Sequence, residues 1–147
     1  MGAAVVGIAG VLIGALATGL AQYAMHLVGR REWRREAAAA AVAGVLGTSR
    51  AHRGRQYLKH VARREGLPDT LDAREARYDA QSAMQDAMDA VITDVADAEL
   101  RRLARDLVGA SLALGDADPA DLDTVGDLAR EKTDALRAAL ARYLHHA

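Results

Sequence analysis

The pattern of hydrophobic and polar positions divides this 147-residue chain into two very different parts. No Lys, Arg, Asp or Glu occurs from Met1 to Gly29, whereas residues 30–35 read Arg-Arg-Glu-Trp-Arg-Arg. A continuous apolar run of this length exceeds the ~20 residues that cross a bilayer as a helix. We therefore predict a single transmembrane helix over residues 1–29, which continues as a helix into the body of the protein.

The charges that flank this run predict its orientation. They follow the apolar run, whereas a cleaved signal peptide carries its charges before a run of about 7–15 residues. Arg30, Arg31, Arg34 and Arg35 form a basic collar suited to a membrane surface, and the positive-inside rule then places the N-terminus outside and the body in the cytoplasm. We expect an inner-membrane protein with the lipid bilayer as a partner.

One face of the predicted anchor is small and polar. Gly10, Gly14, Thr18 and Gln22 recur every four residues, which places them on one side of a helix. Small residues allow two membrane helices to approach closely, and Thr or Gln can hydrogen-bond across the contact. This face predicts self-association, although Gly is also common in membrane helices that do not associate.

The remaining sequence predicts four helical segments with two clear breaks. Residues 33–64 contain no Pro, and Gly66-Leu67-Pro68-Asp69-Thr70 then ends one helix and caps the next. Asp97 is a predicted N-cap, as is Asp118, which would place Pro119 at the first helical position. Apolar stripes at three- and four-residue spacing follow the breaks: Tyr78, Met84, Met88, Val91, Ile92, Val95; Leu100, Leu103, Leu107, Leu114; and Leu122, Val125, Leu128, Leu136, Leu140, Leu144.

Composition favours the same class of fold. The chain has no Cys, no Phe and only two Pro, and Ala is its commonest residue, a balance typical of slender helices. We predict an all-α protein: a single transmembrane helix continuing into a small cytoplasmic antiparallel helical bundle. Its expected parts are the anchor at 1–29, a basic juxtamembrane helix at 30–65 and an acidic helical region at 66–147.

The charge is distributed unevenly between these parts. Residues 30–65 hold ten Lys or Arg against three Glu, a net charge of +7, whereas residues 66–147 hold nine basic and seventeen acidic groups, a net charge of −8. The basic groups within residues 50–64 suit a solvated helix face, and an adjacent membrane surface is the better functional interpretation. Tyr57 alone offers little base stacking, which disfavours nucleic-acid binding.

No arrangement of residues predicts catalysis or a bound cofactor. Asp116, Asp118, Asp121 and Asp123 are as dense as the ligands of a calcium loop, but the interval lacks the internal Gly and terminal Glu of an EF-hand. No combination of Ser, His and acid has a catalytic spacing. We expect a protein that is not an enzyme, with no metal or cofactor.

A resemblance to known proteins rests on the junction that follows the Gly- and Ala-rich run. This junction reads Val28-Gly29-Arg30-Arg31-Glu32-Trp33-Arg34-Arg35-Glu36. It resembles small single-pass membrane proteins of high-GC actinobacteria and their phages. The resemblance covers the first quarter of the chain and implies topology, with no functional residue.

Three functions are compatible with this sequence. The first is a membrane-anchored helical interaction protein, an adaptor or assembly factor that presents an acidic face to a protein partner or to a second copy. The second is a holin-like protein that disrupts membranes through oligomers of the anchor. The third is a structural subunit of a helical assembly that buries the apolar N-terminal helix.

Overall fold

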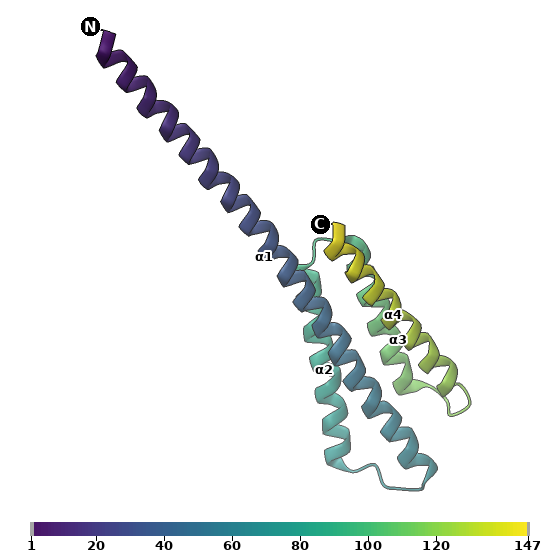
Figure 1. Ribbon diagram of the computed structural model, residues 1–147. Coiled ribbons are helices and arrows are strands. Elements are labelled where there is room, and N and C mark those ends of the chain that lie inside the picture. The colour runs from purple at the N-terminus through teal and green to yellow at the C-terminus, as the bar shows by residue number, and fades with distance from the viewer. Residues whose placement is uncertain (1, 147) are drawn as a thin grey trace. The chain divides into compact units, whose positions relative to one another are not determined.

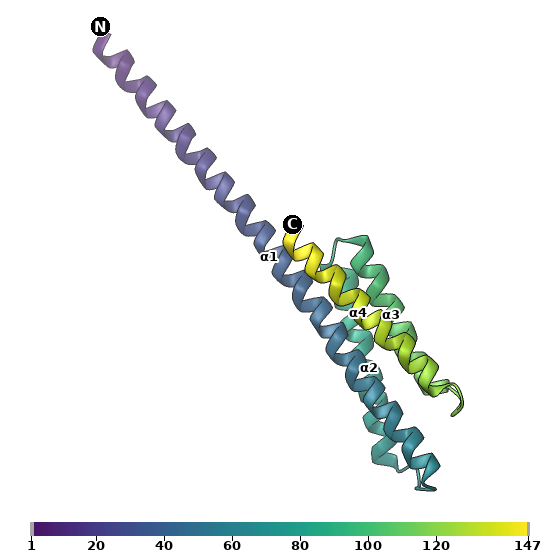
Figure 2. The ribbon, with the colours of Figure 1, turned by 45° about the vertical axis from the view of Figure 1, so that its right-hand side comes forward.

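The computed structural model contains four helices: α1 (Gly2–Arg64), α2 (Leu71–Asp94), α3 (Ala98–Asp116) and α4 (Leu122–His146). It describes the backbone of residues 2–146 and the side chains of residues 29–145. The chain forms two compact units, residues 1–34 and residues 35–147. In the second unit successive helices run in alternating directions, so that the unit is an antiparallel four-helix bundle (Figures 1 and 2). The predicted all-α class and antiparallel bundle are confirmed.

The described residues contradict the predicted membrane topology. Among them no helix combines the length and the apolar character needed to cross a bilayer. In the part of α1 whose side chains are described, the longest uncharged stretch is residues 37–49, between Glu36 and Arg50, and it is shorter than the ~20 residues that a span requires. The predicted transmembrane helix, single-pass topology and inner-membrane localisation are therefore wrong on this finding.

The α1–α2 connection forms as its sequence predicts. Gly66 adopts a φ of 70°, which glycine tolerates because it has no Cβ. Its N–H bonds to the Arg63 carbonyl, and the Leu67 N–H bonds to the Ala62 carbonyl at 2.9 Å, the pair of bonds that closes a Schellman motif. Thr70 then caps α2 by accepting a hydrogen bond from the Ala73 N–H.

The last helix begins one turn later than predicted. Residues 119–121 form a turn that is closed by a 2.9 Å bond from the Asp121 N–H to the Asp118 carbonyl, and the Val125 N–H bonds to Asp121. Helix α4 therefore begins at Leu122. Asp118 and Pro119 open the turn and do not cap the helix.

The predicted N-cap of α3 is confirmed, because an Asp97 carboxylate oxygen accepts a 2.8 Å hydrogen bond from the Leu100 N–H. Replacing Asp97 by Ala is expected to lower the free energy of unfolding by about 0.5–2 kcal/mol. Asp97→Asn is the control, since Asn caps equally well and should leave stability nearly unchanged. Urea denaturation measures both, and equal losses would show that the carboxylate charge matters more than the cap.

The core of the bundle lies where the apolar faces of all four helices meet. Its buried members come from α1, α2, the α2–α3 connection, α3 and α4: Ala38, Ala41, Val42, Val45, Met88, Val91, Val95, Leu100, Leu103, Ala104, Leu107, Leu136 and Ala139. A smaller cluster joins Ala110 and Leu114 of α3 to Ala129 of α4. The α3 stripe is buried as predicted, but Tyr78, Ile92, Leu128 and Leu144 are exposed.

Candidate interaction surface and polar cleft

The inward face of α1 changes from apolar to polar along its length. Ala38, Ala41, Val42 and Val45 are buried in the core, and the same face then continues with four buried polar residues spaced three or four apart. Such spacing keeps side chains on one side of a helix. We call this set the polar row, and it consists of Ser49, His52, Gln56 and His60.

The polar row is only partly hydrogen-bonded within the chain. His60 Nε2 lies 3.1 Å from the Leu114 carbonyl of α3, and Gln56 Nε2 lies 3.5 Å from His52 Nε2. Each residue of the row nevertheless has a buried polar atom without a hydrogen-bond partner, as does Ser111 of α3. Unpaired buried polar atoms cost about 1–3 kcal/mol each, so the row is maintained at the expense of stability.

Burial also affects the protonation of His52. His52 is 1% exposed, and its burial lowers the pKa of the imidazole, because a charged ring is poorly solvated inside the bundle. The neutral ring is therefore the form that the fold favours near pH 7.

Part of the basic segment of α1 has a structural role. Arg53 is half-buried and donates 2.8 Å hydrogen bonds to the Ala129 carbonyl and to Thr133 Oγ1 of α4. Lys59 Nζ donates to the Gly115 carbonyl at the end of α3, also at 2.8 Å. These two cations hold α1 against its neighbours, whereas Arg50, Arg55, Arg63 and Arg64 are exposed.

Exposed apolar side chains gather where α1 ends and α2 begins. Leu58 is 61% exposed, Leu67 56% and Leu71 61%, and Val61 lies one turn beyond Leu58 on α1. We call these four residues the tip patch. An apolar group of this kind, rimmed by the exposed arginines of α1, is typical of a protein-binding surface.

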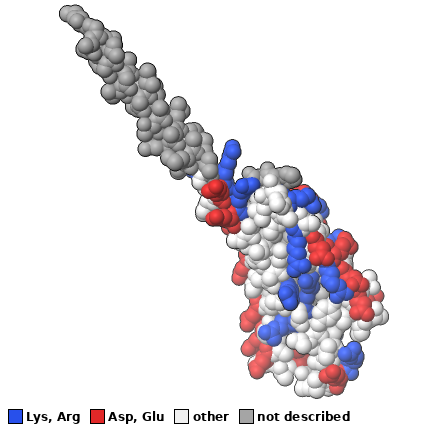
Figure 3. Space-filling model, in the orientation of Figure 1, with Lys and Arg blue, Asp and Glu red and all other residues white. Residues whose placement is uncertain are grey.

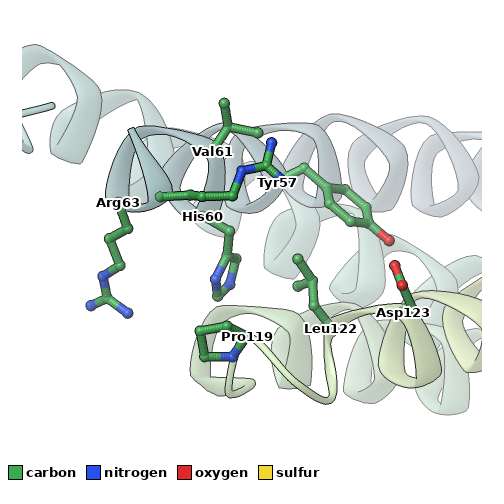
Figure 4. A pocket seen from close by; sticks show the side chains of 8 residues that line it. Tyr57, His60, Val61, Arg63, Pro119, Leu122 and Asp123 are labelled. Atoms are coloured by element: carbon green, nitrogen blue, oxygen red, sulfur yellow. The ribbon is translucent and has the colours of Figure 1, made fainter. Parts of the chain in front are cut away.

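A cleft of about 460 Å³ opens beside the tip patch. Figure 4 shows Tyr57 and His60 extending from α1 toward Pro119, Leu122 and Asp123, which belong to the α3–α4 connection and to α4. The Tyr57 hydroxyl lies against Gly126 of α4, where a Cβ would collide with it. The cleft is lined by Tyr57, His60, Val61, Arg63, Arg64, Pro119, Leu122 and Asp123.

A second cleft, of about 600 Å³, lies between α1, α2 and α3 on the other side of the polar row. It is more polar than the first, because two members of the row line it together with cations from two helices and the exposed ring of Tyr78. Its lining is His52, Gln56, Lys59, Asp69, Arg74, Arg77, Tyr78, Gln81, Leu112, Gly115 and Asp116.

The predicted site residues at the N-terminal end are largely untested. Gly10, Gly14, Thr18 and Gln22 lie outside the residues whose side chains are described, so the packing face stays a prediction. Arg30, Arg31 and Arg34 of the predicted collar are exposed. Arg35 is half-buried and donates a 3.3 Å hydrogen bond to the Leu144 carbonyl of α4, which gives it a structural role within the bundle.

The polar row and the second cleft are what the sequence interpretation missed. The segment 50–64, which contains His52 and His60, was predicted to be a solvated or membrane-facing surface. The signal was present, because Ser49, His52, Gln56 and His60 keep the helical spacing of Val42 and Val45, but polar residues at core spacing do not by themselves indicate burial.

The electrostatic surface of the bundle is mixed. Figure 3 shows Lys and Arg side chains along the middle of the visible face of residues 35–145, with Asp and Glu side chains on either side. Asp79, Asp86 and Asp89 are exposed on α2. Within the described part of the chain, no three His, Cys, Asp or Glu residues are grouped as metal ligands.

These features define an all-α four-helix module with an exposed apolar tip and a row of buried polar residues beside its apolar core. Residues 36–144 match the family described as KilB plasmid transfer protein, and the chain belongs to that family. The match begins where the junction of residues 28–36 ends, and it shows a plasmid-related family without a link to actinobacteria or to membrane proteins. Comparison with curated proteins and with solved structures gives no match.

Proposed function

We propose that this chain is a helical interaction protein of plasmid transfer, an adaptor or assembly factor without a catalytic site of its own. The family supports a role in plasmid transfer. The observation that carries the interaction role is the tip patch, where three leucines in or near the α1–α2 connection are each more than half exposed. Single exposed apolar residues are ordinary, but a group of them marks an interaction site.

The proposed occupant of the tip patch is a protein segment that combines apolar and acidic side chains. Arg55, Arg63 and Arg64 are exposed on the α1 side of the patch, and cations beside an apolar surface favour an oppositely charged partner. The acidic face of α2, with Asp79, Asp86 and Asp89, is the proposed second surface of an adaptor. Arg53 and Lys59 are already bonded within the bundle, which leaves fewer cations for nucleic acid.

The other two functions predicted from the sequence do not gain support. A holin-like protein would need the anchor that the described residues contradict. Burial of the apolar N-terminal helix in a larger assembly concerns side chains outside the described residues, so it stays a prediction.

The proposal predicts that Leu58→Glu and Leu67→Glu each lower plasmid transfer in a mating assay by about tenfold, because each places a carboxylate at the centre of an apolar contact worth about 1–3 kcal/mol. The assay uses a donor strain in which deletion of the chain abolishes transfer of the plasmid.

The matched control is Ile92→Glu, because Ile92 is 51% exposed at the opposite end of α2. All three variants should retain the helical circular dichroism and the melting temperature of the parent. Equal transfer by the Leu58, Leu67 and Ile92 variants would contradict the assignment of the tip patch, and transfer without the chain would contradict the role in transfer.

A further inference from the structure

The polar cleft between α1, α2 and α3 has the construction of a ligand site. Its volume of about 600 Å³ lies within the range of small-molecule sites, about 300–1,000 Å³. His52 and Gln56, which are 1% and 7% exposed, contribute to its lining from α1.

The charges of the cleft favour an anion. Lys59, Arg74 and Arg77 line it from α1 and α2, against the carboxylates of Asp69 and Asp116. Arg77 Nη2 already donates to both carboxylate oxygens of Asp69, at 2.8 and 2.7 Å, and guanidinium groups make similar charge-assisted hydrogen bonds to phosphate and to other carboxylates.

The cations beside Asp69 also affect its carboxyl group. The hydrogen bond from Arg77 lowers the pKa of the Asp69 carboxyl, and the charges of Arg74 and Lys59 lower it further. The carboxylate of Asp69, on the α1–α2 connection, is half-exposed, so it lies where an incoming oxyanion would contact the same cations. Asp69 is therefore an internal competitor for the site.

We propose that this cleft binds a small oxyanionic ligand, with a phosphate or carboxylate group held by Arg74 and Arg77. The exposed ring of Tyr78 at the same cleft offers a surface for a planar group of the ligand. This site is separate from the tip patch and does not depend on the proposed function.

The test is titration of the full chain with inorganic phosphate, adenosine monophosphate or succinate at constant ionic strength, followed by calorimetry and by the side-chain NMR signals of His52 and Gln56. We expect saturable binding of at least one of the three, which distinguishes a phosphate ligand from a carboxylate ligand. Arg74→Gln should weaken binding about three- to tenfold, because it removes one charged hydrogen-bond donor. Arg105→Gln, an exposed cation of α3 outside the cleft, is the matched control.

Asp69→Asn is expected to raise the affinity of the cleft for the oxyanionic probes, a result that misfolding would not produce. It removes the competing negative charge while keeping the shape of the side chain, so binding should tighten about threefold or more. The proposal would be overturned by absence of saturable binding of all three probes, by equal losses in the Arg74 and Arg105 variants, or by weaker binding in Asp69→Asn.

Discussion

Replacing Leu107 by Ala is expected to lower the free energy of unfolding by about 2–5 kcal/mol. The Leu107 side chain is fully buried in the core that all four helices share. Removing most of it forfeits the transfer free energy of the lost methyl and methylene groups and leaves a cavity that close-packed neighbours fill only partly. A small helical unit has little stability to spare, so this one change should remove a large fraction of the total.

Urea denaturation followed by circular dichroism measures this loss. Leu128→Ala is the matched control, because Leu128 belongs to the predicted α4 stripe but is 43% exposed, and its truncation should cost less than about 1 kcal/mol. Equal losses for the two variants would show that the core does not lie where the four helices meet.

Replacing His52 by Leu is expected to raise the free energy of unfolding, by about 1–3 kcal/mol. The reason is that His52 is buried with Nδ1 unpartnered within the chain, and an apolar side chain of similar size has no polar atom to desolvate.

The advantage of the Leu variant should grow as the pH falls from 7 to 5. The pKa of His52 is lowered in the folded state, so below its ordinary value of 6.5 the unfolded chain binds a proton that the folded chain does not. The free energy of unfolding of the parent therefore decreases as the pH decreases through this window. The Leu variant has no imidazole at this position, so it does not show this decrease. Denaturation midpoints at pH 7 and pH 5 measure the difference, and a constant gap between the two proteins would contradict the role assigned to His52 burial.

The sequence predicted correctly those helix ends and caps that depend on residues within about one turn. Gly66 and Asp97 act within one turn of their own position, through a positive φ and a capping carboxylate, and both were predicted. The α3 stripe is buried as predicted because an uninterrupted leucine spacing leaves one choice of inward face. The prediction of Asp118 as an N-cap was wrong. Its carbonyl closes a turn with the Asp121 N–H, and the first bond of α4 is made to Asp121 instead.

The candidate sites were harder to predict because they depend on which surfaces meet. Leu58, Leu67 and Tyr78 have the same apolar character as core residues, and only the packing of the helices leaves them exposed. His52 and Gln56 carry no local mark of burial. The run of residues 1–29 predicted an anchor from hydropathy alone, and the described residues contradict that topology.

The helical class, the breaks between the helices and the caps at Thr70 and Asp97 follow from the sequence alone, because they depend on bonds and apolar spacing within a few residues. Only the tertiary structure decided that the inward face of α1 continues as the polar row beyond Val45. Apolar spacing defines a helix face, but the identity of the residues opposite it decides whether that face meets solvent, a core or a cleft. In this bundle α3 meets the row through Leu114 and Gly115, and that contact encloses polar atoms which the sequence placed at the surface.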